Sequence, residues 1–166
     1  MRLFIAVHFS KEVKETLLSA IDELKAQVVT GNFTKPENLH LTLAFIGESD
    51  RVLDIREIID RCTVPPFEMA VCGAGHFGNL YWVGIEKSPK LKALAESIQN
   101  ELRISGFDIE DREFKPHITV ARQVEASEPV KLNVERKAMN VTSISLMKSA
   151  RINGKLVYTE VYGRRL

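Results

Sequence analysis

Two segments of the chain place a histidine and a threonine at the same short spacing. His40 and Thr42 lie in the segment HLTL, and His117 and Thr119 lie in the segment HITV. In both segments the polar residues alternate with apolar ones, which predicts a β-strand with one buried face. Because residues i and i+2 of a strand point to the same face, each histidine is expected to lie beside its threonine.

An internal pseudo-twofold that relates the two predicted strands would bring both imidazoles and both hydroxyls to one place. An imidazole titrates near neutral pH, so two of them can divide the work of general base and general acid. Hydroxyl groups can donate hydrogen bonds to the non-bridging oxygens of a phosphate. The repeated pattern therefore predicts phosphoryl chemistry catalysed by His40 and His117.

Other common ways of handling phosphate find little support in the sequence. The two motif histidines have no carboxylate or cysteine near them on their strands, so they make a poor metal-binding set. The glycine-rich segment GAGHFGN lacks the Lys-Ser/Thr pair of a phosphate-binding loop. We expect no metal and no cofactor, and we assign His8 and His76 structural or surface roles.

The elements that must position these motifs can be predicted from apolar periodicity, capping residues and turn signals. Helices are expected from Ser10 to about Val29, from Asp50 to before Pro65, and from Ser88 to Gly106. Strands are expected at Leu3–Phe9, 33–35, 39–47, 67–78, 80–86, 116–122, Met139–Arg151 and Lys155–Gly163.

This order of elements predicts a mixed α+β fold, since strands and helices do not alternate regularly. No linker or low-complexity segment divides the chain, so we expect residues 1–166 to form one domain. Asn153–Gly154 is the strongest hairpin turn in the sequence, and the polar, acidic segment 123–129 is expected to be a loop.

Composition limits the class of partner. The net charge is +1, which is low for a protein that grips long nucleic acid by its phosphates. Residues 131–166 nevertheless contain eight Lys or Arg against two Glu, which suits a small anion or the end of an RNA. No apolar run is long enough for a membrane helix or a signal peptide, and we expect a cytoplasmic monomer that does not bind membranes.

The same segments resemble a known family. The paired His-apolar-Thr-apolar motifs resemble those of the two-histidine phosphoesterases. The segments MRLFIAV, KPENLHLTLAFIGE and FKPHITVAR are similar to the branch of RNA 2′,3′-cyclic phosphodiesterases, historically named 2′-5′ RNA ligases. The similarity runs from Leu3 to the closing strands.

The resemblance implies a bilobal fold, in which two antiparallel sheets line a central cleft and the helices lie outside. It also implies hydrolysis of RNA 2′,3′-cyclic phosphate ends to 2′-phosphates. By analogy, His117 would activate water, His40 would protonate the departing 3′ oxygen, and Thr42 and Thr119 would hold the phosphate. Any RNA joining would be the ATP-independent reverse of this chemistry.

The family further implies substrate contacts five residues beyond each histidine, at Phe45 and Arg122. Strict alternation would turn both side chains away from the histidine face, unless a bulge restores them. Without a bulge, Phe45 would be a core residue and Arg122 a solvent-facing charge. Alternation would also place Ala44, where many relatives carry Lys, on the histidine face, so a cation would be missing there.

Three other interpretations remain open at this point. The chain could hydrolyse a small cyclic phosphate, such as a cyclic nucleotide or an ADP-ribose cyclic phosphate. It could bind RNA ends without catalysis, which requires the threonines and Arg122 but not both imidazoles. Finally, the repeated motif could serve folding alone.

Overall fold

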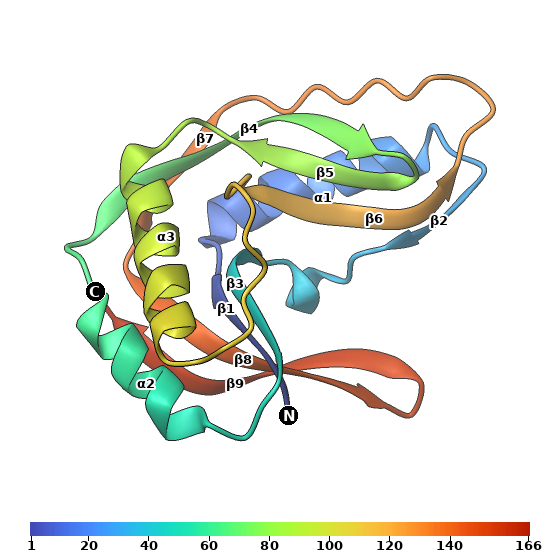
Figure 1. Ribbon diagram of the computed structural model, residues 1–166. Helices are drawn as coiled ribbons and strands as arrows, with labels where there is room; N and C mark the ends of the chain where they lie inside the picture. Colours follow the sequence, from blue (N-terminus) through green and yellow to red (C-terminus); the bar gives the residue numbers. More distant parts are fainter.

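The computed structural model describes residues 1–166 as nine strands, three α-helices and one short 3-10 helix (Figure 1). The strands are β1 (Arg2–Val7), β2 (Thr30–Phe33), β3 (Leu41–Glu48), β4 (Phe67–Phe77), β5 (Leu80–Ile85), β6 (His117–Glu125), β7 (Lys137–Val141), β8 (Ser143–Ile152) and β9 (Lys155–Arg165). The helices are α1 (Lys11–Lys25), η1 (Pro36–Asn38), α2 (Val52–Arg61) and α3 (Pro89–Ile104).

The strands form two antiparallel sheets with matching plans. One sheet has the order β3-β1-β8-β9, and the other has the order β2-β6-β5-β4-β7. In each sheet, three antiparallel strands follow the strand that carries a histidine motif: β1, β8 and β9 follow β3, and β5, β4 and β7 follow β6. Strand β2 is added on the outer side of β6. The predicted α+β fold with two antiparallel sheets is confirmed.

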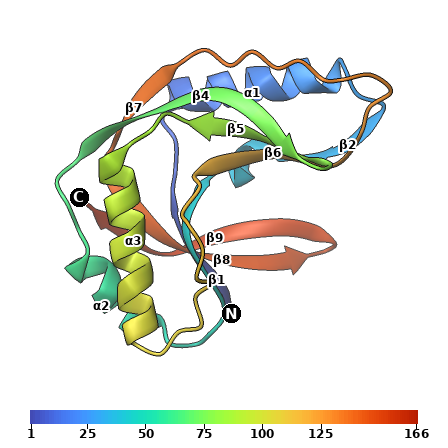
Figure 2. The same cartoon turned by 45° about the horizontal axis from the view of Figure 1, so that its top comes forward.

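The helices cross from one sheet to the other. Helix α1 follows β1 of the first sheet but packs on β2, β6 and β7 of the second. Helix α3 follows β5 of the second sheet but packs on β3 of the first, with α2 against α3 and β9. Figures 1 and 2 show α1 along the sheet that contains β4, β5 and β6, and α3 beside α2 at one side of the molecule.

Local sequence accounts for the element ends. The Ser10 and Ser88 side chains accept hydrogen bonds from the amides of Val13 and Leu91, both at 3.2 Å, so both predicted serine caps are present. The hairpin between β8 and β9 turns at Asn153–Gly154, where both φ angles are positive, as a type I′ turn requires.

The helix and strand that precede the first motif differ from the prediction. Helix α1 ends at Lys25 rather than near Val29, and β2 covers Thr30–Phe33 rather than 33–35. The amide of Val29 donates instead to the carbonyl of Glu125 in β6. Pairing with a distant strand thus overrides the local helical pattern, because that pattern contains no information about partners far away in the sequence.

Two expectations about the last third of the chain are also wrong. The segment Met139–Arg151 is not one strand, since β7 and β8 belong to different sheets and separate at Thr142. The expected loop at 123–129 begins later, because β6 continues to Glu125. Neither the break at Thr142 nor the end of β6 at Glu125 coincides with a proline or glycine, so turn signals in the sequence did not predict them.

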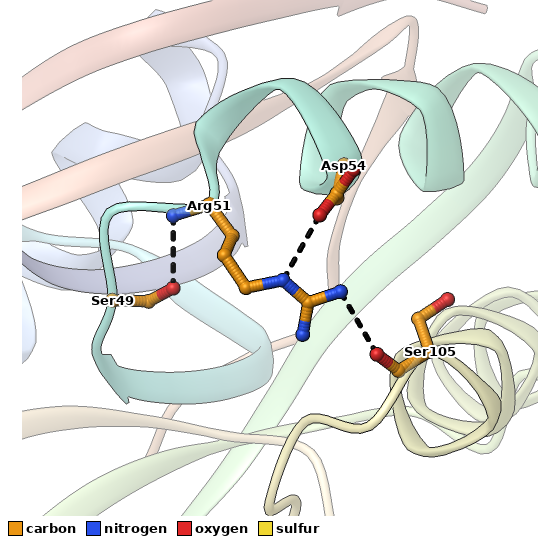
Figure 3. A network of polar contacts seen from close by, with 4 residues as sticks. All are labelled: Ser49, Arg51, Asp54 and Ser105. Atoms are coloured by element: carbon orange, nitrogen blue, oxygen red, sulfur yellow. Dashed lines mark hydrogen bonds and ion pairs between the residues drawn. The ribbon is translucent and has the colours of Figure 1, made fainter.

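The first turn of α2 is fastened to the end of α3 by Arg51 (Figure 3). Its Nε donates to Asp54 Oδ2 at 2.9 Å, and its Nη2 donates to the main-chain oxygen of Ser105 at 2.9 Å. The guanidinium also lies 4.2 Å from the centroid of the Phe107 ring. These contacts join the two helices that cover the sheet containing β3. No helix in the structure is long and apolar enough to cross a membrane.

We expect Arg51→Ala to lower the free energy of unfolding by about 1 kcal/mol, because a charge-assisted hydrogen bond to the α3 carbonyl is lost from a partly exposed site. In a chain of this size the melting temperature should fall by about 3 °C. The matched control is Arg112→Ala, whose ion pair with Glu110 at 2.6 Å is local and exposed. Equal melting temperatures for the two variants would contradict a fastening role for Arg51.

Candidate active site

The two motif histidines are held in the same way. The Nδ1 atom of His40 lies 2.7 Å from the main-chain oxygen of Asn38, and that of His117 lies 2.8 Å from the oxygen of Lys115. A carbonyl oxygen can only accept, so Nδ1 carries the proton in both rings. Each neutral imidazole is therefore left with Nε2 as an acceptor, and each charged one with Nε2–H as a donor.

The short element before His40 is anchored by a buried side chain. Asn38 is 7% exposed, and its Nδ2 donates to the main-chain oxygen of Leu156 in β9 at 3.1 Å. Its own main-chain oxygen is the one that accepts from His40. A single buried residue thus ties η1 to a neighbouring strand and fixes the tautomer of the first histidine.

A bulge inside each motif decides which side chains share the histidine face. From Thr42 to Ala44, β3 advances two residues while β1 advances only from Ala6 to Ile5. From Thr119 to Ala121, β6 advances two residues while β5 advances only from Trp82 to Tyr81. The extra residues are Leu43 and Val120, the last residue of each motif. Alternation therefore restarts one position later in both strands.

The bulges return the fifth residue after each histidine to the histidine face. Phe45 pairs with Phe4 across the ladder and is 50% exposed, so the interpretation of Phe45 as a core residue is wrong. Arg122 occupies the matching position in β6, and its charge lowers the pKa of His40, which is carried by the other sheet. The structure thus brings Arg122 within electrostatic reach of the first motif.

The expectation about Ala44 is overturned by the same bulge. Ala44 is 3% exposed and belongs to the hydrophobic core, as does Ala121 in the second motif. Its side chain does not share the face of His40 and Thr42, so no cation is missing from the site at this position.

The main-chain groups freed by the bulges have other partners. The oxygen of Leu43 accepts from Gln99 Nε2 of α3 at 2.8 Å, and the oxygen of Val120 accepts from the amide of Thr34 at 2.9 Å. The Thr34 hydroxyl also donates to the oxygen of Thr119 at 3.0 Å. Both bulges are therefore fixed parts of the fold rather than irregular strand ends.

Different aromatic side chains surround the two rings. The His40 ring lies 4.8 Å from the Phe4 ring and 5.1 Å, edge to face, from the Tyr158 ring, measured between centroids. The His117 ring lies 5.5 Å from Phe77 and 6.4 Å from Trp82. These four aromatic residues were not identified from the sequence, because their strands carry no motif.

Burial and neighbouring charges act on the histidine of the first motif. Burial lowers the pKa of His40, the hydrogen bond to Asn38 opposes this, and the positive charges of His8 and Arg122 lower it further. The sequence predicts a structural or surface role for His8, yet this residue follows Val7, which pairs with Leu41, and so lies across from His40. The sequence alone does not give the register between β1 and β3, so it does not predict that His8 lies near His40.

Phe33 and His76 lie apart from this face. Phe33 pairs with Ala121, packs against the core and has Lys25 Nζ 5.2 Å from its ring centroid. His76 stacks on Tyr81 at 5.0 Å beside a hollow of about 540 Å³. His76 pairs with Tyr81, and Tyr81 pairs with the core residue Ala121. This position, away from the two motif histidines, agrees with a structural or surface role for His76. No three His, Cys, Asp or Glu side chains are grouped as a metal would require.

These features can be compared with known proteins. The family model described as the 2'-5' RNA ligase superfamily matches residues 13–153. The chain belongs to this superfamily. It is 32% identical to a Methanothermobacter thermautotrophicus protein named RNA 2',3'-cyclic phosphodiesterase, over 100% of this chain and 99% of that one. An Archaeoglobus fulgidus protein of the same name is 34% identical over 82% of this chain and 80% of that one.

Solved structures of the superfamily share the whole fold. TT0787 of Thermus thermophilus superposes with a TM-score of 0.90 at 26% identity, covering 100% of this chain and 98% of that one. Escherichia coli LigT complexed with 3'-AMP gives a TM-score of 0.88 at 26% identity, covering 99% and 97%. The family resemblance inferred from the two motifs is thus confirmed.

The charge of Arg122 gives a direct test of this geometry. We expect His40 in the free protein to titrate below the ordinary imidazole pKa near 6.5, and Arg122→Gln to raise that pKa because a positive neighbour is removed. The measurement is an NMR titration of the histidine ring protons. Arg165→Gln, at the end of β9, is the control and should leave the His40 titration unchanged. An unchanged pKa in Arg122→Gln would show that the guanidinium does not reach the first motif.

Proposed function

We propose that this chain hydrolyses RNA 2′,3′-cyclic phosphate ends to 2′-phosphates by metal-independent catalysis with two histidines. The two imidazoles support this proposal most directly, because both hydrogen-bond the main chain through Nδ1 and both keep Nε2 available for proton transfer. The relatives named RNA 2',3'-cyclic phosphodiesterase support the choice of substrate.

The proposed reaction is an in-line displacement at phosphorus. His117 Nε2 takes a proton from water as the water oxygen attacks the phosphorus. The bond from phosphorus to the 3′ oxygen breaks, and His40 Nε2–H gives its proton to that oxygen. The products are a 2′-phosphate and a free 3′-hydroxyl. Attack by a 5′-hydroxyl in place of water would give a 2′-5′ linkage without ATP.

The other site residues have supporting roles in this proposal. The hydroxyls of Thr42 and Thr119 donate to the two non-bridging oxygens and stabilise the charge that grows there. Arg122 holds the same phosphate, as a planar cation with several donors can. Phe45 shapes the face on which the nucleotide lies.

We infer likewise that residues 1–166 act as one bilobal catalytic domain. A single cluster of 35 buried residues includes Leu3 and Ile5 of one sheet and Met69 and Val83 of the other. A core shared in this way keeps the two motifs in a constant relation, which general acid–base catalysis by two groups requires.

The first test is turnover of adenosine 2′,3′-cyclic phosphate in the presence of EDTA. His40→Ala and His117→Ala should each reduce kcat by about 10²- to 10⁴-fold, because each removes one proton transfer. His76→Ala is the control, since that ring is engaged with Tyr81 and the oxygen of Gly78. Binding without turnover in the unaltered protein would favour an RNA-end binder, and activity that survives both motif substitutions would favour a folding role for the repeat.

A second test separates the acid from the base. When sulfur replaces the 3′ bridging oxygen of the cyclic phosphate, the leaving group is a thiolate, which departs near neutral pH without protonation. His40→Ala should then recover most of its lost rate, whereas His117→Ala should not. Recovery by His117→Ala alone would exchange the two roles and leave the paired-histidine reaction intact.

A further inference from the structure

The arginines of this chain differ in whether a carboxylate neutralises them. Ion pairs are formed by Arg51, Arg61, Arg103, Arg112, Arg136 and Arg164. Of the others, Arg56 lies over the Tyr162 ring, and Arg151 and Arg165 are exposed in the last two strands. The remaining two, Arg2 and Arg122, are both on the histidine face.

Arg2 is combined with an exposed aromatic ring. Its Cζ lies 5.0 Å from the centroid of the Phe45 ring, which is half exposed. Glu48, the residue across the ladder from Arg2, directs its carboxylate to the N-terminal amine of Met1 at 3.3 Å. Arg2 thus keeps its charge free for an anion. An open ring beside a free guanidinium suits a stacked base and its phosphate.

The distance of this pair from the first motif matches one step of an RNA chain. Thr42 is level with Ala6 in β1, and Phe45 is level with Phe4. The two levels are separated by two residues of β1, or about 7 Å. This is close to the length of one nucleotide, so a chain held at His40 by its last phosphate would bring the preceding phosphate near Arg2.

The charges around the first motif also favour this direction. Burial raises the pKa of Tyr158, and the positive charges of Arg122 and Arg2 both oppose it, so both guanidiniums act electrostatically on the phenol beside His40. Towards the other end of β1, the carboxylate of Glu160 acts on His8 and accepts from Ser145 at 2.6 Å. Lys14 also acts on His8 and offsets Glu160 there, so the positive charge without a carboxylate partner lies on the Arg2 side and attracts an anionic chain in that direction.

We propose that Arg2 and Phe45 form a subsite for the nucleotide on the 5′ side of the cyclic end. Arg2 contacts the phosphate that links the last two nucleotides, and Phe45 stacks on the base of the penultimate one. The substrate class is then an oligoribonucleotide that ends in a cyclic phosphate, in preference to a cyclic mononucleotide. This inference rests on the proposed function, since it takes the cyclic phosphate at the histidine pair as its fixed point.

The test compares three substrates: adenosine 2′,3′-cyclic phosphate, the diadenosine ApA with the same cyclic end, and that dinucleotide with a neutral methylphosphonate linkage. The mononucleotide should be the poorest substrate of the unaltered protein, because it lacks the base that stacks on Phe45. Of the two dinucleotides, the charged one should have a kcat/KM about tenfold higher than the methylphosphonate. Arg2→Ala should remove this advantage, while its loss on the mononucleotide stays within about twofold. Arg165→Ala, another arginine without a carboxylate partner, is the control.

Salt dependence gives a second measurement that needs no variant. The slope of log kcat/KM against log salt concentration should be steeper by up to about 0.7 for the charged dinucleotide than for the methylphosphonate, as one added phosphate contact requires. Equal slopes, or equal kcat/KM for all three substrates, would overturn the subsite while the proposed function stands. Absence of hydrolysis of every substrate would instead overturn the proposed function.

Discussion

The site depends on one backbone irregularity that occurs twice. In a regular strand, Phe45 and Arg122 would face away from their histidines, and Ala44 and Ala121 would face towards them. The extra residue at Leu43 and at Val120 reverses both relations. It also lets two consecutive apolar side chains enter the core in each motif, which stabilises the bulge by burial as well as by the hydrogen bonds from Gln99 and Thr34.

The crossing of the helices explains why the two motifs can keep a constant relation. Helix α3 leaves the second sheet and covers β3 of the first, where Gln99 holds the first bulge. Helix α1 leaves the first sheet and covers the second. Strands β3 and β6 also contact each other directly. Separating the lobes would therefore expose part of one shared core, so the pair of histidines is supported by the stability of the whole chain.

Sequence predicted most of the elements and the two motifs, because periodicity, serine caps and the Asn153–Gly154 turn are local signals. It failed where the deciding partner is distant in the chain. The end of α1 depends on pairing between Val29 and Glu125, and the break at Thr142 depends on β7 and β8 joining different sheets. The bulges were raised only as a condition, since nothing in HLTL or HITV distinguishes a bulged strand from a regular one. His8 and Tyr158 were missed because strand register, and no local motif, places them beside His40.

The duplicated scaffold holds the two histidines alike, whereas the proposed reaction gives them different work. The main-chain hydrogen bonds are the same in both motifs, so the backbone alone gives each ring the same tautomer and the same free nitrogen. The difference comes from neighbouring side chains. The half-buried His40 ring lies beside those of Phe4 and Tyr158, and its partial burial and the charges of His8 and Arg122 together favour loss of its proton. A group that releases its proton readily is suited to protonate a departing oxygen once a bound anionic phosphate has restored the charged form. In the proposed reaction, the charge of the bound phosphate thus keeps His40 protonated, and His40 can act as the acid only when the phosphate is bound.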